Sequence, residues 1–174
     1  MPAYPVPRGK NQDFLPRRTD QRFPPRFNRK ALEQQSDLPG LTIIDLLKKI
    51  GKTQLQNSKY VRIKKVEFNK TRNLYKFTTE TYDPVKKETR IHVQRIYPRN
   101  PYYTGKLSEA RDGVKITCNC GNFLFCDEVA LFNHAAADII YSNGDYPIDT
   151  NPNLKPWSCK HCFKDLLFLV QKGL

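Results

Sequence analysis

Two short stretches decide the fold of this chain: Thr-Cys-Asn-Cys-Gly-Asn-Phe at residues 117–123 and Trp-Ser-Cys-Lys-His-Cys at residues 157–162. The chain has 174 residues and 5 cysteines, and every cysteine lies between Cys118 and Cys162. An odd number of clustered cysteines suits a metal site better than a framework of disulfides. We therefore expect the rest of the chain to be arranged around a bound metal ion.

The spacing of the cysteines and the histidine predicts the ligands. A closed zinc site takes four thiolate or imidazole ligands in a tetrahedron. A Cys-x-Cys pair at the end of a strand supplies two sulfurs on one tight turn, and a Cys-x-His pair at the start of a helix supplies two more ligands. We predict that a structural Zn²⁺ is bound by Cys118, Cys120, Cys159 and His161.

Two further cysteines are alternative ligands. Either Cys126 or Cys162 in place of His161 gives four thiolates, which suit another zinc set or an iron–sulfur cluster. Cys162 also falls on the apolar stripe of the last helix, which favours a buried packing role. Cys159 and Cys162 form a Cys-x-x-Cys motif, but too few residues follow it for a thioredoxin-like scaffold.

The sequence contains no catalytic motif that points to an enzyme. It has no serine–histidine–aspartate set, no paired-carboxylate motif and no phosphate-binding glycine loop. A metal with four protein ligands leaves no position for a substrate. We expect a protein that is not an enzyme and has no small-molecule substrate.

The two paired half-sites resemble the SWIM zinc finger, whose signature is CxC followed at a distance by CxH. Phe123 after the first pair and the apolar helix after the second pair match the flanks of that family. The 38 residues between Cys120 and Cys159 make a longer gap than is usual, and Gly121 stands where proline is common. The resemblance implies a zinc-binding, ββα-like module at the C-terminus.

A second resemblance covers the C-terminal third. The run from Ala137 to Pro156, followed by Cys159-Lys160-His161, looks like a segment of tailed-bacteriophage structural proteins that carry a SWIM-like ligand set. It implies a virion component of the tail, baseplate or neck, made in the cytoplasm of the bacterial host. The implied partners are other virion structural proteins.

The net charge of +13 is unevenly distributed. Residues 37–117 hold 18 Lys and Arg against 8 Asp and Glu, whereas residues 118–174 hold 4 against 6. A basic surface invites a nucleic-acid partner, and the alternative function is a nucleic-acid-binding SWIM protein with Tyr60, Tyr75 or Phe27 available for stacking. The acidic cysteine region makes this the second choice. No apolar run approaches the roughly 20 residues that span a membrane, so no membrane partner is expected.

Residues 1–36 predict an extended arm rich in proline and arginine. Its 6 prolines block helix formation, and its basic and aromatic residues are spaced along it. We expect it to dock on neighbouring subunits through Arg17, Arg18, Arg22, Phe23, Arg26 and Phe27.

The remaining pattern predicts an α+β fold: an antiparallel β-meander followed by the C-terminal SWIM-like module. In residues 37–112 we expect a helix at 41–50 that stops at Gly51, and strands at 59–68, 73–82 and 88–97. In residues 113–174 we expect a strand at 114–117, a short return strand at 123–126, an inserted helix at 127–141 and a final helix from about residue 159.

Two details of the strands follow from the residue pattern. The alternation slips at Lys64-Lys65, which predicts a β-bulge. The strand at 88–97 is expected to place Ile91 and Val93 on one face, with His92 among its solvated positions.

Overall fold

The structure is a computed structural model in which residues 38–142 and 144–174 are described. The predicted arm lies outside the described residues and stays a prediction. The same holds for its six docking residues, Arg17, Arg18, Arg22, Phe23, Arg26 and Phe27.

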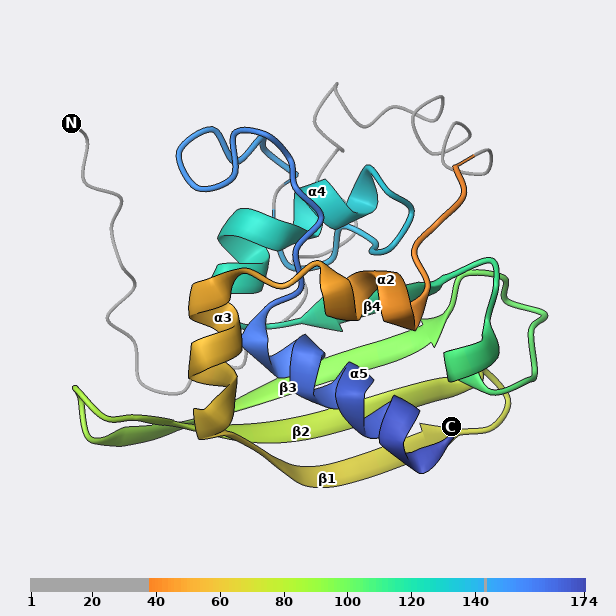
Figure 1. Cartoon of the computed structure of the whole chain (residues 1–174), viewed down its shortest axis with the longest axis horizontal. Coiled ribbons are helices and arrows are strands. Elements are labelled where there is room, and N and C mark those ends of the chain that lie inside the picture. The colour runs from red at the N-terminus through yellow and green to blue at the C-terminus, as the bar shows by residue number, and fades with distance from the viewer. Residues whose placement is uncertain (1–37, 143) are drawn as a thin grey trace.

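A four-stranded antiparallel sheet forms one layer of the α+β fold (Figure 1). Its strands are β1 (Val61–Asn69), β2 (Leu74–Asp83), β3 (Glu88–Pro98) and β4 (Val114–Cys118). Each strand pairs with the next one along the chain, which is the predicted meander extended by a fourth strand. The register shifts between Ile63 and Lys65, so the predicted bulge is confirmed.

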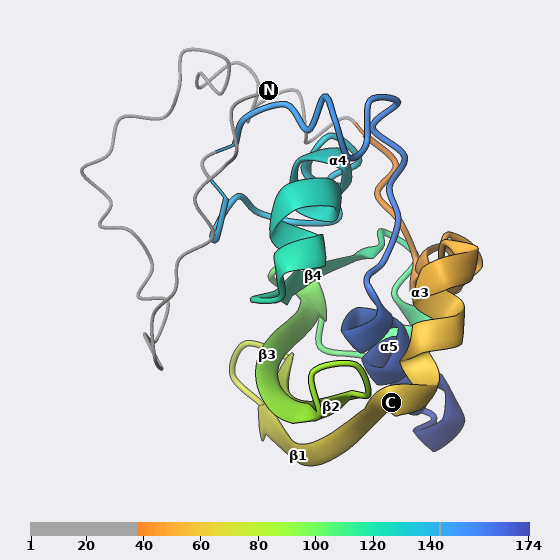
Figure 2. The ribbon, with the colours of Figure 1, turned by 90° about the vertical axis from the view of Figure 1, so that its left-hand side faces the viewer.

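Helices cover one face of this sheet. The sheet curls around α5 (Lys160–Lys172), and α2 (Ile43–Lys48) and α3 (Lys52–Asn57) lie on the same side (Figures 1 and 2). The shorter elements of the described chain are η2 (Ser58–Tyr60), η3 (Leu107–Glu109), the π-helical turn η4 (Phe123–Asp127) and α4 (Glu128–Phe132).

The core fills the space between α5 and the sheet. Alternate residues of a strand point to the same face, and on this face the buried apolar side chains include Phe77, Ile96 and Ile116. Leu166 and Leu169 of α5 are fully buried against them. The ring of Phe168 meets that of Phe77 edge to face, with ring centroids 5.8 Å apart.

The inserted helix is much shorter than predicted. The structure has α4 ending at Phe132 in place of a helix over 127–141, and Ala135 adopts a left-handed conformation with φ of 53° that stops it. Residues 140–142 do not make helical hydrogen bonds. Their backbone N–H groups donate to the buried carboxylate of Glu128. The predicted return strand at 123–126 is also wrong, because these residues form η4.

The structure corrects two further predictions, one about the faces of β3 and one about Gly51. Ile91 is 66% exposed, whereas Gln94 is fully buried and His92 is half-buried, so the inward phase of β3 is opposite to the predicted one. Pairing with β2 sets this phase, because His92 lies opposite the buried Thr79. The predicted helix at 41–50 is α2, which ends at Lys48 with Lys49 as its C-cap. Gly51 does not stop this helix but is the N-cap of α3.

Candidate metal centre

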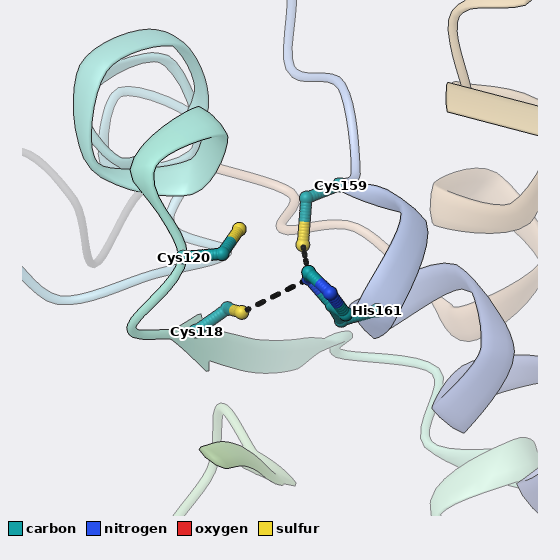
Figure 3. Close-up of side chains that lie close together, drawn as sticks. All are labelled: Cys118, Cys120, Cys159 and His161. Carbon is teal, nitrogen blue, oxygen red and sulfur yellow. Dashed lines mark hydrogen bonds between the residues drawn. The ribbon is translucent and has the colours of Figure 1, made fainter. Parts of the chain in front are cut away.

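The structure brings together Cys118, Cys120, Cys159 and His161, and these four could hold a metal ion (Figure 3). Their ligand atoms all lie within 4.8 Å of one another. The His161 Nδ1 atom is 3.8 Å from the Cys118 sulfur and 4.0 Å from the Cys159 sulfur. A tetrahedral zinc ion holds nitrogen and sulfur about 3.6 Å apart, so small shifts would close the four ligands on one ion.

Two element ends position the four side chains. Cys118 is the last residue of β4, and its pairing with Gln94 of β3 puts its sulfur on the face that α5 covers. Cys120 follows on the turn before η4. Cys159 is the N-cap of α5 and His161 lies in its first turn. A possible metal-binding Cys₃His site therefore joins a strand end to a helix start.

The turn between Cys118 and Cys120 is tied to the neighbouring strand. The backbone N–H of Asn119 donates to the Val93 carbonyl at 3.3 Å. In return, the Asn119 side-chain oxygen accepts the Val93 N–H at 2.9 Å. This reciprocal pair fixes the direction of the turn and, with it, the positions of both sulfurs.

Each of the three sulfurs accepts an N–H group. The Gln94 side chain donates to Cys118 at 3.5 Å. Backbone N–H groups donate to Cys120 from Phe123 at 3.4 Å and to Cys159 from Cys162 at 3.5 Å. Such donors stabilise the charged thiolate, which is the form that binds metal.

The imidazole of His161 is oriented by a hydroxyl group. Its Nε2 lies 2.8 Å from the Thr81 Oγ1, whereas its Nδ1 faces the sulfurs. If Nδ1 binds a metal, Nε2 carries the proton and donates a hydrogen bond to the Thr81 hydroxyl oxygen. The His92 ring lies against His161 at a centroid distance of 4.3 Å. Burial, followed by the proximity of His161, lowers the pKa of His92 to about 4, so His92 is neutral at pH 7.

Because the cluster is buried, the negative charges of its thiolates need a bound cation to offset them. Exposure is 0% for Cys118 and Cys159, 4% for Cys120 and 1% for His161. Burial raises the pKa of the Cys118 and Cys159 thiols well above their usual range. Hydrogen bonds from these two thiols lower the pKa of Cys120. Three thiolates can coexist here only if a bound cation offsets their charge.

The alternative ligands lie outside the group of four. Cys162 is fully buried, and its sulfur points to the Thr117 carbonyl of β4 at 3.8 Å. Cys126 is half-buried, and its carbonyl accepts a hydrogen bond from the Asn151 side chain. His134 follows α4 and is exposed.

The sequence reasoning missed the residues that support the ligands, namely Thr81, Gln94, Asn119 and His92, whose ring lies tilted against that of His161. A usable signal was present in β3. His92 and Gln94 are polar residues at alternate positions leading to the buried Ile96. Polar groups in the inward phase of a strand must find buried partners, and here those partners are the cluster and its neighbours.

Comparison with known protein families, with curated proteins and with solved structures finds no match to this chain. The likenesses to SWIM zinc fingers and to phage structural proteins therefore rest on the sequence motifs. None of the helices in residues 38–142 and 144–174 is both long and apolar enough to cross a bilayer.

Proposed function

We propose that Cys118, Cys120, Cys159 and His161 bind one Zn²⁺ as the structural ion of a SWIM-type zinc finger. The observation that carries this proposal is the closed, buried set of four ligand atoms within 4.8 Å. Three thiolates and one imidazole are a common structural zinc set, and zinc sites filled by four protein ligands are structural rather than catalytic. Iron–sulfur clusters are usually held by four cysteines, whereas this set has three cysteines and one histidine.

The protein then acts as a passive building block rather than an enzyme. The ion would join the end of β4 to the start of α5, so the sheet and its covering helix form one rigid body. A metal with no open position has no place for substrate or activated water. What the protein offers to partners is its surface.

We further propose that this body is a structural component of a tailed-phage virion, in its tail, baseplate or neck. The likeness of residues 137–156 to phage structural proteins supports this role, as does the composition of residues 1–36. The basic arm would extend over neighbouring subunits while the zinc-stabilised body holds it in place. This role requires that particle assembly be lost when the arm alone is removed.

Metal analysis tests the zinc proposal. Protein purified without oxygen is expected to contain one zinc per chain and to be colourless. Cys120→Ser should lose the metal and melt at a lower temperature, because binding of the ion is coupled to folding. The matched control is Cys126→Ser, at a cysteine outside the group of four, and it should keep both the metal and the stability. A brown, iron-containing protein, or metal loss in the control, would contradict the assignment.

A further inference from the structure

The face of the sheet that α5 does not cover carries exposed apolar side chains. Strand pairing places Arg62, Glu80 and Ile91 in one row across β1, β2 and β3. Tyr82 and Thr89 form the next row toward the end of the sheet. Tyr82 is 47% exposed and Ile91 is 66% exposed. An aromatic ring and an aliphatic side chain therefore stand in solvent on a strand surface.

A hollow of about 290 Å³ opens at this end of the sheet. Its walls are formed by Lys59, Tyr60, Arg62, Glu80, Tyr82 and Thr89. Two tyrosines and two basic residues thus surround one depression. The Lys59 ammonium group lies 4.9 Å from the centre of the Tyr60 ring, which keeps this cation beside the hollow.

The charges around the hollow are predominantly positive. The cations that line the hollow are Lys59 and Arg62, and the carboxylate that lines it is Glu80. Lys65, Glu67 and Lys76 lie farther along the same face, and Asp83 and Glu88 follow Tyr82 and precede Thr89 in the hairpin. Glu67 is shared by two lysines, at 3.0 Å from Lys65 and 3.2 Å from Lys76, and Glu80 pairs with Lys64 at 3.0 Å. Among the described residues, Arg62 makes no ion pair. Glu80 is paired with Lys64 and Glu88 with Arg90, so Lys59 and Arg62 leave an excess of positive charge at the hollow.

We propose that this surface, the tyrosine face formed by Tyr60, Arg62, Tyr82 and Ile91 with the surrounding lysines, binds single-stranded nucleic acid. The cations are placed to contact phosphates, and the Tyr82 ring at the edge of the hollow offers a flat surface on which an unstacked base can lie. An acidic protein would also match the charge, but an exposed ring beside cations favours a nucleic acid, whose bases stack on aromatic rings between phosphate contacts.

This site is independent of the metal centre. The cluster lies on the α5 side of the sheet, where Thr81 faces His161. The tyrosine face lies on the opposite side, since Glu80 and Tyr82 flank Thr81 along β2 and successive side chains alternate. Substitutions at Tyr82 or Arg62 can therefore be made without touching a ligand or a residue that supports one.

Fluorescence anisotropy with a labelled 20-nucleotide single strand, as DNA and as RNA, tests the proposal on the full chain. Tyr82→Ala should weaken binding by about 5- to 150-fold, the range for loss of one stacked base. Tyr82→Phe keeps the ring and should stay within about threefold of the parent protein. Arg62→Gln should make the slope of log affinity against log salt shallower by about 0.7, the value for one lost phosphate contact.

The matched control is Tyr102→Ala, which removes a tyrosine that is 89% exposed in the loop after β3. It should bind as the parent protein does. Zinc content and melting temperature are measured for every variant, so that a folding defect is recognised. The proposal is overturned if the strand does not bind at low salt, if Tyr82→Ala binds normally, or if polyglutamate displaces the strand at equal charge concentration.

Discussion

Gln94 and Asp165 are both fully buried polar side chains, and they differ in whether partners surround them. The Gln94 amide donates to the Cys118 sulfur, and its oxygen accepts the Thr79 hydroxyl at 3.2 Å. Neither carboxyl oxygen of Asp165 has a hydrogen-bond partner. Burial raises the pKa of Asp165 well above its usual range, so this side chain is protonated over a wider range of pH in the folded protein. The first residue supports the metal centre, whereas the second weakens the core.

Replacing Asp165 by asparagine should stabilise the protein at neutral and alkaline pH. An aspartate in the unfolded chain ionises near pH 4, whereas the folded protein retains the proton to higher pH. The folded state thus binds more protons above pH 4, and stability falls as pH rises until the folded pKa is passed. The amide that Asp165→Asn introduces does not titrate, so the variant escapes this loss.

Urea unfolding measured from pH 5 to pH 8 checks this expectation. The advantage of Asp165→Asn should grow with pH by about 1.4 kcal/mol per pH unit while the pH lies between the unfolded and the folded pKa of Asp165. Glu109→Gln, at an exposed carboxylate 3.6 Å from the Lys106 ammonium group, is the control and should show no such growth. An advantage that is the same at every pH would contradict the protonation argument.

At the scale of the elements, the sequence predicted the features that depend on residues close together in the chain. The residue pattern over 73–82 predicted the strand β2, and the slip at Lys64-Lys65 predicted the bulge. The four residues of the candidate centre could be chosen from spacing alone, because Cys-x-Cys and Cys-x-His fix ligands within one turn each.

The predictions that failed concern features that are set by residues far apart in the sequence. The apolar residues of 127–141 have helical spacing, but Glu128 binds the backbone of residues 140–142 and draws that segment out of a helix. The inward phase of β3 depends on its pairing with β2, which a single strand does not reveal. Thr81 and His161 are 80 residues apart, so their hydrogen bond could not be read from local sequence.

The contact between the start of α2 and the start of β4 makes Gly113 indispensable. Its φ is 90°, and a Cβ there would lie 2.6 Å from the Leu41 carbonyl oxygen. The same backbone segments are joined by a hydrogen bond from the Val114 N–H to that oxygen at 2.9 Å. No side chain fits between them.

Gly113→Ala should therefore destabilise the protein by about 2–4 kcal/mol, from backbone strain together with the displaced contact. Thermal and urea unfolding measure the effect. Gly121→Ala is the matched control, because a Cβ at Gly121 would make only an ordinary contact at 3.9 Å with the Phe125 ring. If the two variants were equally stable, the close approach of the two segments would be disproved.

For the whole molecule, we propose a zinc-stabilised body whose folding does not depend on residues 1–36. The ligands, the residues that support them and the tyrosine face all lie in the body. Removal of residues 1–36 also removes 8 of the 30 Lys and Arg residues, and none of these lies near the cluster in sequence. Folding and assembly can therefore be tested separately.

A protein that lacks residues 1–36 should fold, bind one zinc and remain monomeric, but it should fail to enter phage particles. Complementation of a phage that lacks the full-length protein, followed by analysis of the purified particles, measures incorporation. Metal content and melting temperature of the truncated protein serve as the folding control. Normal incorporation without the arm would disprove its docking role, and loss of zinc would show that the arm belongs to the body.

The segment between the two half-sites has internal hydrogen bonds of its own, besides those that join Asp138 to the sheet. Glu128 holds residues 140–142, and Asn151 holds both the Cys126 and the Lys155 carbonyls, so the excursion is closed by its own hydrogen bonds before it returns to Cys159. Halving or doubling such a loop changes its closure entropy by only about 0.6 kcal/mol. During divergence, this excursion can therefore lengthen, shorten or acquire new surface while the ligands stay in place. The distance between the pairs is then a poor guide to kinship among such proteins, and the residues inside each pair are a good one.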